Sequence, residues 1–212
     1  MSIIKDCGIV LRENIAGETN KRLVLLTKNH GKVVVFARGA KGAKSKLSAN
    51  KLSYNEFVIY DGGQFFSLTQ CSPIVQFANI PLDYNAFCVA NFILELSDKI
   101  MLENMEALDT LNLVLMAFYR LEKAALPSLV QAVFTLKLLQ KEGFFGEHCT
   151  ENPDFMNISK EANAAINYIL STPIKRVFNF RVSSDVMNEL QQYALLFLQQ
   201  NVDLQLKSLE FF

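Results

Sequence analysis

The sequence has little of what catalytic and metal-binding proteins usually depend on. Its 212 residues include no tryptophan, two histidines and four cysteines, the latter at positions 7, 71, 88 and 149. No two cysteines are closer than 17 residues, so no CxxC pair is present for zinc or redox chemistry. We therefore expect reduced cysteines that pack as small hydrophobic side chains, with no metal and no cofactor.

Long apolar runs are also missing. The longest ones, such as residues 113–119, are far shorter than the ~18 residues that a membrane span requires. The amino terminus lacks the basic and apolar regions of a signal peptide, which predicts a cytoplasmic location without membrane association. With 50% hydrophobic and 20% charged residues, the composition is typical of a globular protein with one or two cores.

Catalytic motifs are likewise absent. His30 and His148 have no recognisable nucleophile motif beside them, and neither GxSxG nor HExxH occurs. Residues 39–45, GAKGAKS, resemble a P-loop only superficially. Two residues separate the glycines where a P-loop has four, and Ala43 intervenes before Lys44. The sequence therefore predicts two surface histidines and a protein that is not an enzyme.

Charge is present in balance but unevenly spread. Residues 1–60 carry eleven Lys or Arg against four Asp or Glu, whereas residues 61–212 carry ten against seventeen. Between Thr19 and Asn55 there are nine basic residues and no acidic one. Such an asymmetry favours contact between this part of the protein and a polyanion, although a solvated basic face without a partner remains the alternative.

The amino-terminal part has the pattern of short strands. Apolar alternation or short apolar runs predict strands over residues 3–12, 23–27, 32–38, 53–60 and 64–69. Asn29-His30-Gly31 and Asp61-Gly62-Gly63 are typical turns between them. Five short strands in ~70 residues favour a small closed barrel, because closure removes exposed edges. Residues 39–51 are too polar and basic for a strand, which predicts a long loop or a short surface helix.

From Pro81 onward the pattern is helical. We expect helices over residues 83–101, 108–125, 127–142, 159–171 and 183–200, with Pro127 in a first turn and with Ser159 and Ser183 as N-caps. Residues 108–121 are apolar nearly all round, which favours a central place in the helical core. Residues 143–158 are irregular and predict a loop. The sequence thus predicts an α+β protein with a barrel over residues 1–80 and a helical domain over residues 81–212.

The strand predicted at residues 32–38 has a pattern that suits nucleic-acid binding. Val33, Val35 and Ala37 alternate with outward residues that include Phe36 between two cations. Cations for phosphates and a ring for base stacking are what a single-strand-binding surface needs, although Phe36 packed under the next loop is an equal alternative. The predicted DNA-binding residues are Lys21, Arg22, Lys28, Lys32, Phe36, Arg38, Lys41, Lys44, Lys46 and Lys51.

These residues also carry a family resemblance. Gly8-Ile-Val-Leu-Arg12, the strand at residues 21–27, Gly31-Lys32 and the basic segment from Ala37 to Leu47 resemble the amino-terminal domain of RecO, the recombination mediator of bacterial DNA repair. Residues 136–144 and the ending LKSLEFF are similar to the family's helical domain and terminus. The resemblance implies an amino-terminal five-stranded OB-fold followed by an all-α domain.

The same resemblance implies a function and partners. RecO proteins bind single- and double-stranded DNA, anneal complementary strands, and assist RecA loading together with RecR and the single-strand-binding protein, which implies a location at the nucleoid. Many RecO proteins carry a four-cysteine zinc module after the helix that here ends near Gly143. This region is short in the present chain and holds only Cys149, so the resemblance implies a member without zinc.

We therefore predict a DNA repair mediator, with an OB-fold adaptor for an acidic protein partner as the alternative. The tail of the single-strand-binding protein is acidic and ends in phenylalanine, so its site needs an apolar slot with cations at the rim. The predicted partner-binding residues are Arg120, Lys123, Lys137 and Lys141, with Lys175, Arg176 and Arg181 as a competing cluster. Ordinary surface cations are the alternative for most of them.

Overall fold

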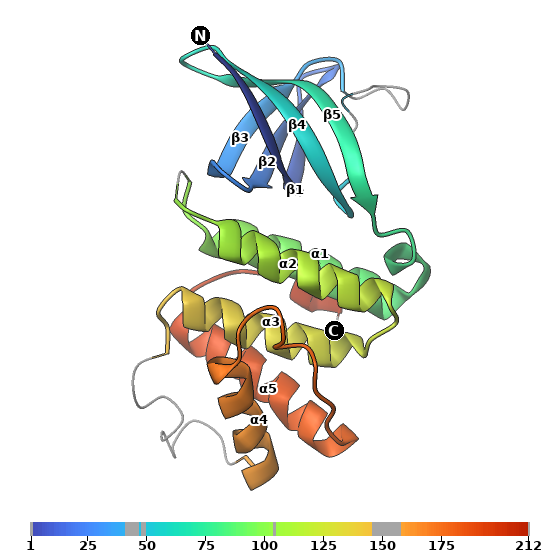
Figure 1. The fold of residues 1–212 in the computed structure, drawn as a ribbon, viewed down its shortest axis with the longest axis vertical. Coiled ribbons are helices and arrows are strands. Elements are labelled where there is room, and N and C mark those ends of the chain that lie inside the picture. The colour runs from blue at the N-terminus through green and yellow to red at the C-terminus, as the bar shows by residue number, and fades with distance from the viewer. Residues whose placement is uncertain (1, 41–46, 48–49, 104, 146–157, 212) are drawn as a thin grey trace. The chain divides into compact units, whose positions relative to one another are not determined.

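The computed structural model describes residues 2–40, 47, 50–103, 105–145 and 158–211. Five strands come first and five α-helices follow, as predicted for an α+β protein (Figure 1). The chain divides into two compact units, each formed by two segments. The first unit comprises Met1–Ala78 and Leu94–Leu115, and the second comprises Asn79–Ile93 and Met116–Phe212. The predicted domain boundary at residues 80 and 81 stays a prediction.

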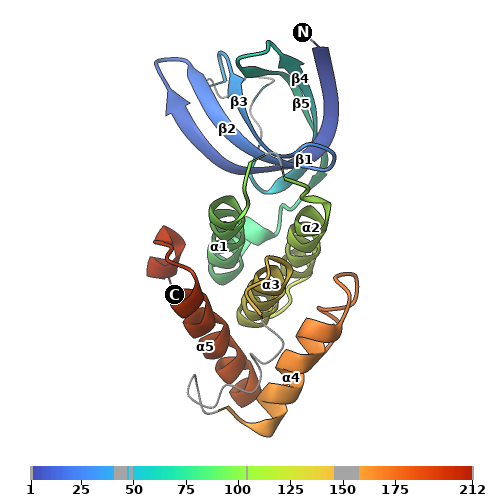
Figure 2. The same ribbon diagram turned by 90° about the vertical axis from the view of Figure 1, so that its left-hand side faces the viewer.

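The strands of the first unit form a closed barrel in the order β1-β2-β3-β5-β4. Their bounds are β1 Ser2–Ala16, β2 Asn20–Thr27, β3 Gly31–Ala37, β4 Ser53–Asp61 and β5 Phe66–Gln76. All neighbouring strands are antiparallel except β3 and β5, which are parallel. Figure 2 shows β1 and β2 curving around the barrel interior. Five strands closed in this way have the OB-fold architecture.

The inner faces of these strands form the barrel core. Alternation along β3 directs Val33, Val35 and Ala37 inward, where they pack with residues of the other strands. This confirms the predicted inner face of residues 32–38. The remaining buried members of the cluster are Val10, Leu23, Leu25, Ala40, Phe57, Ile59 and Leu68. The structure also extends the predicted strands, because β1 continues past a register shift at Val10 and Arg12 to Ala16.

Residues of β1 and β2 that alternate with the inner set are buried as well. Ile9, Val24 and Leu26 are no more than 1% exposed, so a second layer must cover this outer face. Residues 94–115 of the same unit supply it through Asp98, which lies 2.7 Å from Arg12 Nε and 3.0 Å from Lys32 Nζ. Lys32 Nζ also donates hydrogen bonds to the backbone oxygens of Asp98 and Met101.

The turn between β2 and β3 approaches the same segment closely. Gly31 has a φ of +66°, and a Cβ at this position would lie 1.9 Å from the Met105 carbonyl oxygen. The neighbouring Lys32 forms a parallel bridge with Glu103. Glycine is therefore required at position 31 for two reasons: the positive φ, and the lack of space for a side chain beside the Met105 backbone.

The helices have nearly the predicted bounds. They are α1 Tyr84–Ile100, α2 Leu108–Glu122, α3 Pro127–Lys141, α4 Lys160–Ser171 and α5 Ser184–Asn201, with short 3₁₀ helices at Ile80–Leu82 and Lys207–Phe211. Ser159 Oγ accepts from Ala162 N, and Ser183 Oγ accepts from Val186 N, which confirms both predicted N-caps. Pro127 occupies the first turn of α3, as expected.

Helix α3 is the central helix of the second unit and packs against α4 and α5 (Figure 2). Residues Val130–Leu136 are buried without interruption, whereas α2 exposes Asn112 and Tyr119. Residues 108–121 are largely buried too, in keeping with their predicted place in the helical core: Leu113, Val114, Ala117 and Phe118 are 0% exposed. Helix α3 buries polar side chains as well, because Gln131 accepts from Gln191 and Thr135 donates to the Gln131 carbonyl.

Most of the predicted loop at residues 143–158 lies outside the described residues. Among the helices that the structure describes, none is both long and apolar enough to cross a membrane.

The close approach at Gly31 leads to a testable prediction with an internal control. Gly17 also has a positive φ, of +73°, but nothing lies within 4 Å of a Cβ built there. We expect Gly17→Ala to cost only the left-handed backbone penalty, about 1–2 kcal/mol. Gly31→Ala should lower the free energy of unfolding further, because the Met105 backbone must also move. Equal losses in urea unfolding of the two variants would contradict this.

Candidate nucleic-acid interface

A row of side chains crosses the barrel near one end of β2. Register pairs Asn14 of β1 with Arg22 of β2, Arg22 with Phe36 of β3, and Phe36 with Ser67 of β5. Directly opposed side chains share a face and lie about 4.5–5.5 Å apart at Cβ. Because Val35 and Ala37 point inward, this row lies on the outer face of the barrel. It combines a guanidinium, an aromatic ring and two hydrogen-bonding groups.

An aromatic pocket adjoins this row. The rings of Phe36 and Phe65 meet edge to face, with centroids 5.7 Å apart and planes at 89°. Phe65 is 63% exposed although it is a large apolar side chain. A cavity of about 340 Å³ lies beside the two rings, and its lining is completed by Ala16, Asn20, Arg38 and Ser67. We name these six residues the aromatic pocket.

The aromatic pocket is connected to the basic segment that follows β3. Asn20 Oδ1 accepts a hydrogen bond of 3.0 Å from Gly39 N. Gly39 has a φ of +68°, so the chain turns sharply directly after Arg38. Asn20 therefore fixes where the basic segment starts. Lys41, Lys44 and Lys46 of that segment lie outside the described residues.

The structure separates several cations that are close in sequence. Arg22 shares the outer face of Phe36, but Lys21 points to the opposite face of β2 and pairs with Glu13 at 3.1 Å. Lys28 lies beyond the far end of β2, on a different cavity. Lys51 is half-buried in the turn before β4. Of the described predicted residues, only Phe36 and Arg38 line the aromatic pocket, and Arg22 pairs with Phe36 on the same outer face.

Lys32 belongs to the interior of the first unit. It is 8% exposed, and Asp98 and two backbone oxygens surround its ammonium. A buried ammonium that is paired in this way is not available to a phosphate without loss of these contacts. Lys32 is therefore not part of the outer surface that carries the aromatic pocket.

Two of the predicted partner-binding cations are engaged in hydrogen bonds within the second unit. Arg120 Nη2 donates to the Phe178 carbonyl at 2.7 Å, and Lys137 Nζ donates to the Ile169 and Leu170 carbonyls at 3.2 and 2.8 Å. Burial lowers the pKa of the Lys137 ammonium. Both side chains thus hold elements of the second unit together.

The other cations of the second unit are exposed. Lys123 lies 5.8 Å from the centre of the Tyr119 ring, and Lys141 is exposed at the end of α3. Lys175, Arg176 and Arg181 are also exposed, between α4 and α5. Partner binding by any of these residues stays a prediction.

A second polar cluster forms where β1 meets the β2–β3 turn. The Asp6 side chain is completely buried, and its Oδ2 lies 2.6 Å from Nδ1 of His30. It also accepts hydrogen bonds from Cys7 N, Asn29 N and Asn29 Nδ2. Burial alone would raise the pKa of this carboxyl, but these hydrogen bonds outweigh it and hold the pKa below its ordinary value.

His30 is therefore more than the surface histidine that the sequence predicted. Its side chain is 45% exposed, yet one ring nitrogen is held by a buried carboxylate. His148 lies outside the described residues.

Neither a metal cluster nor an activated thiol is found in the described part of the chain. No three His, Cys, Asp or Glu residues come together there as metal ligands, and Cys149 lies outside it. Cys7, Cys71 and Cys88 form no disulfide. Burial raises the pKa of the Cys71 thiol to about 11, which favours the unreactive thiol.

Sequence reasoning missed Phe65 and the Asp6–His30 pair. Phe65 follows Gly62 and Gly63 in a turn, where an apolar ring has no core to enter, and that position was the available signal. The Asp6–His30 pair spans 24 residues. Only the pairing of β1 with β2 brings its members together.

The pKa of Asp6 yields a prediction for acid stability. A carboxyl whose folded pKa lies below its unfolded value stabilises the fold fully above the unfolded value, and this contribution is lost as the pH falls through the folded pKa. Asp6→Asn should therefore lower the free energy of unfolding by about 1–3 kcal/mol at pH 7. The difference from the parent protein should shrink as the pH falls below 3.8, the ordinary value.

Urea unfolding of the full chain from pH 7 down to pH 2.5 measures this difference. Asp203→Asn is the matched control, because Asp203 is exposed, and it should show no such trend. A difference between Asp6→Asn and the parent that stayed constant over this range would contradict the assigned role of the Asp6 charge.

Comparison with known proteins agrees with this architecture. Residues 1–77 match the family model described as "Recombination protein O N terminal". The DNA repair protein RecO of Acetivibrio thermocellus is 28% identical over the whole of this chain and 96% of its own length. That of Caldicellulosiruptor bescii is 27% identical over the whole chain and 98% of its length. That of Bacillus velezensis is 36% identical over 67% of this chain and 57% of its own.

The match to the amino-terminal model covers the barrel that carries the aromatic pocket, and the similarity to the Acetivibrio and Caldicellulosiruptor proteins extends over the helices as well. The chain belongs to the RecO family of DNA repair proteins.

Proposed function

We propose that this protein acts in DNA repair and recombination as a non-enzymatic mediator that binds single- and double-stranded DNA at the outer face of its barrel. The observation that carries the proposal is the aromatic pocket, with Phe36 and Phe65 beside Arg38 and with Arg22 on the same face. The similar proteins are named DNA repair proteins, so DNA repair is the process in which we expect this binding to act.

The chemistry of this surface suits a single strand. Every base has a flat face that can stack on a ring, so an exposed phenylalanine binds bases without selecting among them. The guanidinium groups of Arg22 and Arg38 supply positive charge for the phosphates that flank the stacked base. OB-folds commonly bind oligonucleotides on the strand 2–3 face and on the loops after strands 1 and 4. The aromatic pocket draws on those same elements, through Ala16, Asn20, Phe36 and Phe65.

Annealing follows from charge neutralisation. Two complementary strands repel each other through their phosphates, and a cationic surface that holds both lowers this repulsion. Lys41, Lys44 and Lys46 would extend the cationic surface beyond Arg38, because they follow it directly in the sequence. Duplex DNA would bind through the same phosphate contacts, without the stacking contribution. A protein with this role acts in the cytoplasm, at the nucleoid.

The proposal includes RecR, the single-strand-binding protein and, indirectly, RecA as partners. For the acidic, phenylalanine-ended tail of the single-strand-binding protein, Lys123 is a better candidate than Arg120 or Lys137, whose donors are engaged within the second unit. Lys123 lies near Tyr119, and Tyr119 and Leu126 are 53% and 58% exposed. Exposed apolar side chains with a cation at their edge are what such a tail requires.

The electrostatic part of the proposal is tested by salt dependence. On single strands the slope of log K against log salt is about −0.7 for each phosphate contact. Arg22→Gln combined with Arg38→Gln should therefore make the slope less steep by about 1.4 and weaken binding to a dT oligonucleotide. Fluorescence anisotropy at several salt concentrations measures both effects.

Lys123→Gln is the matched control, because it removes an exposed cation from the second unit. It should leave the slope unchanged. An unchanged slope in the double Arg variant would exclude this face as the phosphate-binding surface. A protein that binds only an acidic protein partner would show no oligonucleotide binding at all.

The stacking part is tested at Phe65, which is largely exposed and contributes little to the core. Phe65→Ala should weaken binding to the dT oligonucleotide by about 1–3 kcal/mol, the usual contribution of one stacked base, and should leave the melting temperature unchanged. Phe87→Ala removes an exposed ring from the second unit and should leave both the affinity for the oligonucleotide and the melting temperature unchanged. A lower melting temperature with unchanged affinity would show that Phe65 serves packing instead.

A further inference from the structure

A second cavity lies at the mouth of the barrel, at the far end of β2 from the aromatic pocket. It measures about 550 Å³, within the range of ligand pockets, and the mouths of β-barrels are frequent ligand sites. It opens where β2 passes into β3, around His30, and the segment from Met105 to Leu108 borders it. The two cavities lie on opposite faces of the barrel wall, since Phe66 lines this one whereas its neighbours Phe65 and Ser67 line the aromatic pocket.

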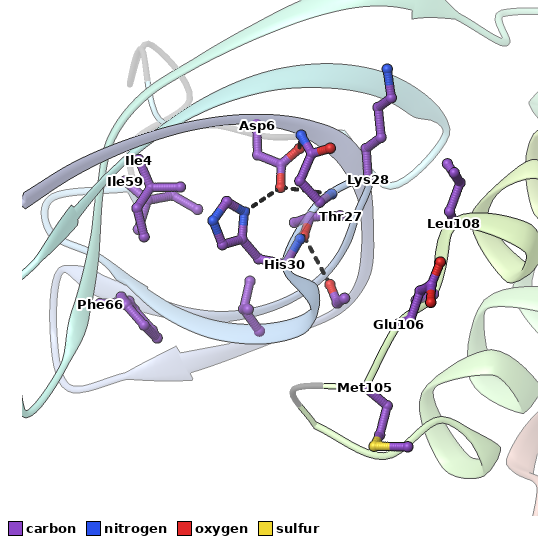
Figure 3. A pocket seen from close by; sticks show the side chains of 14 residues that line it. Ile4, Asp6, Thr27, Lys28, His30, Ile59, Phe66, Met105, Glu106 and Leu108 are labelled. Carbon is purple, nitrogen blue, oxygen red and sulfur yellow. Dashed lines mark hydrogen bonds and ion pairs between the residues drawn. The ribbon is translucent and has the colours of Figure 1, made fainter.

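The mouth cavity contains a built polar group. Asp6 is fully buried and accepts from two backbone amides, from Asn29 Nδ2 and from His30 Nδ1. Because Nδ1 donates to the carboxylate, Nε2 is the ring nitrogen that remains for a ligand, and in the protonated ring it donates to an anionic oxygen. Figure 3 shows the His30 ring between Asp6 and the side chains of Ile4 and Ile59. Asp6 thus positions His30 over the opening.

Below the ring the cavity is apolar. Its floor comes from inward residues of four strands, namely Ile4, Val33, Ile59 and Phe66. These side chains can pack against a flat apolar group of a ligand. They have no polar atoms that could bind an isolated ion. A ligand that fits this cavity therefore has an apolar or aromatic body as well as a polar group for His30.

The charged groups around the cavity favour one anionic group on the ligand. Lys28 and His30 line it on the β2–β3 side and Glu106 on the other, and the negative charge of Asp6 is directed at His30. In Figure 3 Lys28 extends away from His30, and its flexible four-carbon stem allows the ammonium to reach a ligand at the rim. Asn29 and Glu106 supply acceptors for amino and hydroxyl groups.

We propose that the barrel mouth binds a nucleoside monophosphate, with the base on the apolar floor and the phosphate at Nε2 of His30 and the ammonium of Lys28. The apolar floor closes the cavity on one side, so it accepts an end group more readily than the interior of a strand. The ligand is therefore either a free nucleotide or the phosphorylated end of a DNA strand. The second source rests on the proposed DNA binding, whereas the first does not.

Titration calorimetry of the full chain with dAMP tests the site, with deoxyadenosine and inorganic phosphate as separate probes. We expect dAMP to bind at least tenfold more tightly than either probe, because each lacks half of the contacts. Lys28→Gln and His30→Gln should each weaken dAMP binding at least threefold, and together at least tenfold. Lys51→Gln, a half-buried cation of the same barrel away from the cavity, should change nothing.

Three results would overturn the proposal. These are the absence of dAMP binding at millimolar concentration, equal affinity for dAMP and phosphate, and unchanged dAMP affinity in the Lys28→Gln variant. Lys28 is exposed, so its substitution leaves the fold intact even where His30→Gln perturbs the Asp6 cluster.

A dT oligonucleotide with and without a terminal phosphate distinguishes the two sources. Preference for the phosphorylated strand that disappears in Lys28→Gln identifies a DNA end as the ligand. Equal binding of both strands, with dAMP still bound, identifies a free nucleotide. Failure of both oligonucleotides to bind would refute the proposed DNA function and would leave dAMP binding at the barrel mouth as a separate result.

Discussion

Asp98 is almost completely buried, yet it forms ion pairs with Arg12 and Lys32 of the barrel at the same time. A buried charge of this kind is tolerated only when its partners are in place. The strands β1 and β2 are apolar on both faces, so the barrel requires a cover over Ile9, Val24 and Leu26. The ion cluster determines how residues 94–115 meet that face, and the absence of a side chain at Gly31 allows the contact to close. The first unit is therefore a barrel together with its covering segment.

The ion pair of Lys32 with Asp98 also shows that not every basic residue of the sequence is available to a polyanion. Nine cations without an acidic neighbour in the sequence look like one polyanion-binding surface. In the folded protein, however, some of these cations form ion pairs with carboxylates. Lys32 pairs with Asp98 and Lys21 pairs with Glu13, whereas Arg38 lines the aromatic pocket and Arg22 shares the outer face of Phe36. Part of the positive charge therefore maintains the fold, and the rest is available to a ligand. A count of charges cannot make this division, because it depends on which carboxylates the fold brings near.

The two ends of β2 differ in chemistry for a related reason. At one end, the exposed ring of Phe65, the half-buried ring of Phe36 and nearby guanidinium groups form an open surface that suits a strand passing across it. At the other end, a buried carboxylate orients a histidine over an apolar floor, which suits a small group that enters. Phe66 lines the second region from inside the barrel, while Phe65 and Ser67 line the first from outside. Lys28 and His30 lie away from the aromatic pocket, so substitutions at Lys28 should leave that pocket intact. This independence allows the two proposals to be tested in the same protein.

The sequence by itself determined the order of five strands and five helices, the inner face of β3, both serine N-caps and the family, because these depend on local periodicity, turn residues and motifs. It also singled out Arg22, Phe36 and Arg38. Only the tertiary structure decided that Lys32 is buried, that Lys137 and Arg120 bond to backbone carbonyls, that α3 buries the polar Gln131 and Thr135, and that Asp6 holds His30. Each of these depends on contacts between residues distant in the chain, and neither hydrophobic periodicity nor charge pattern records which partners the closed barrel and the packed helices bring together.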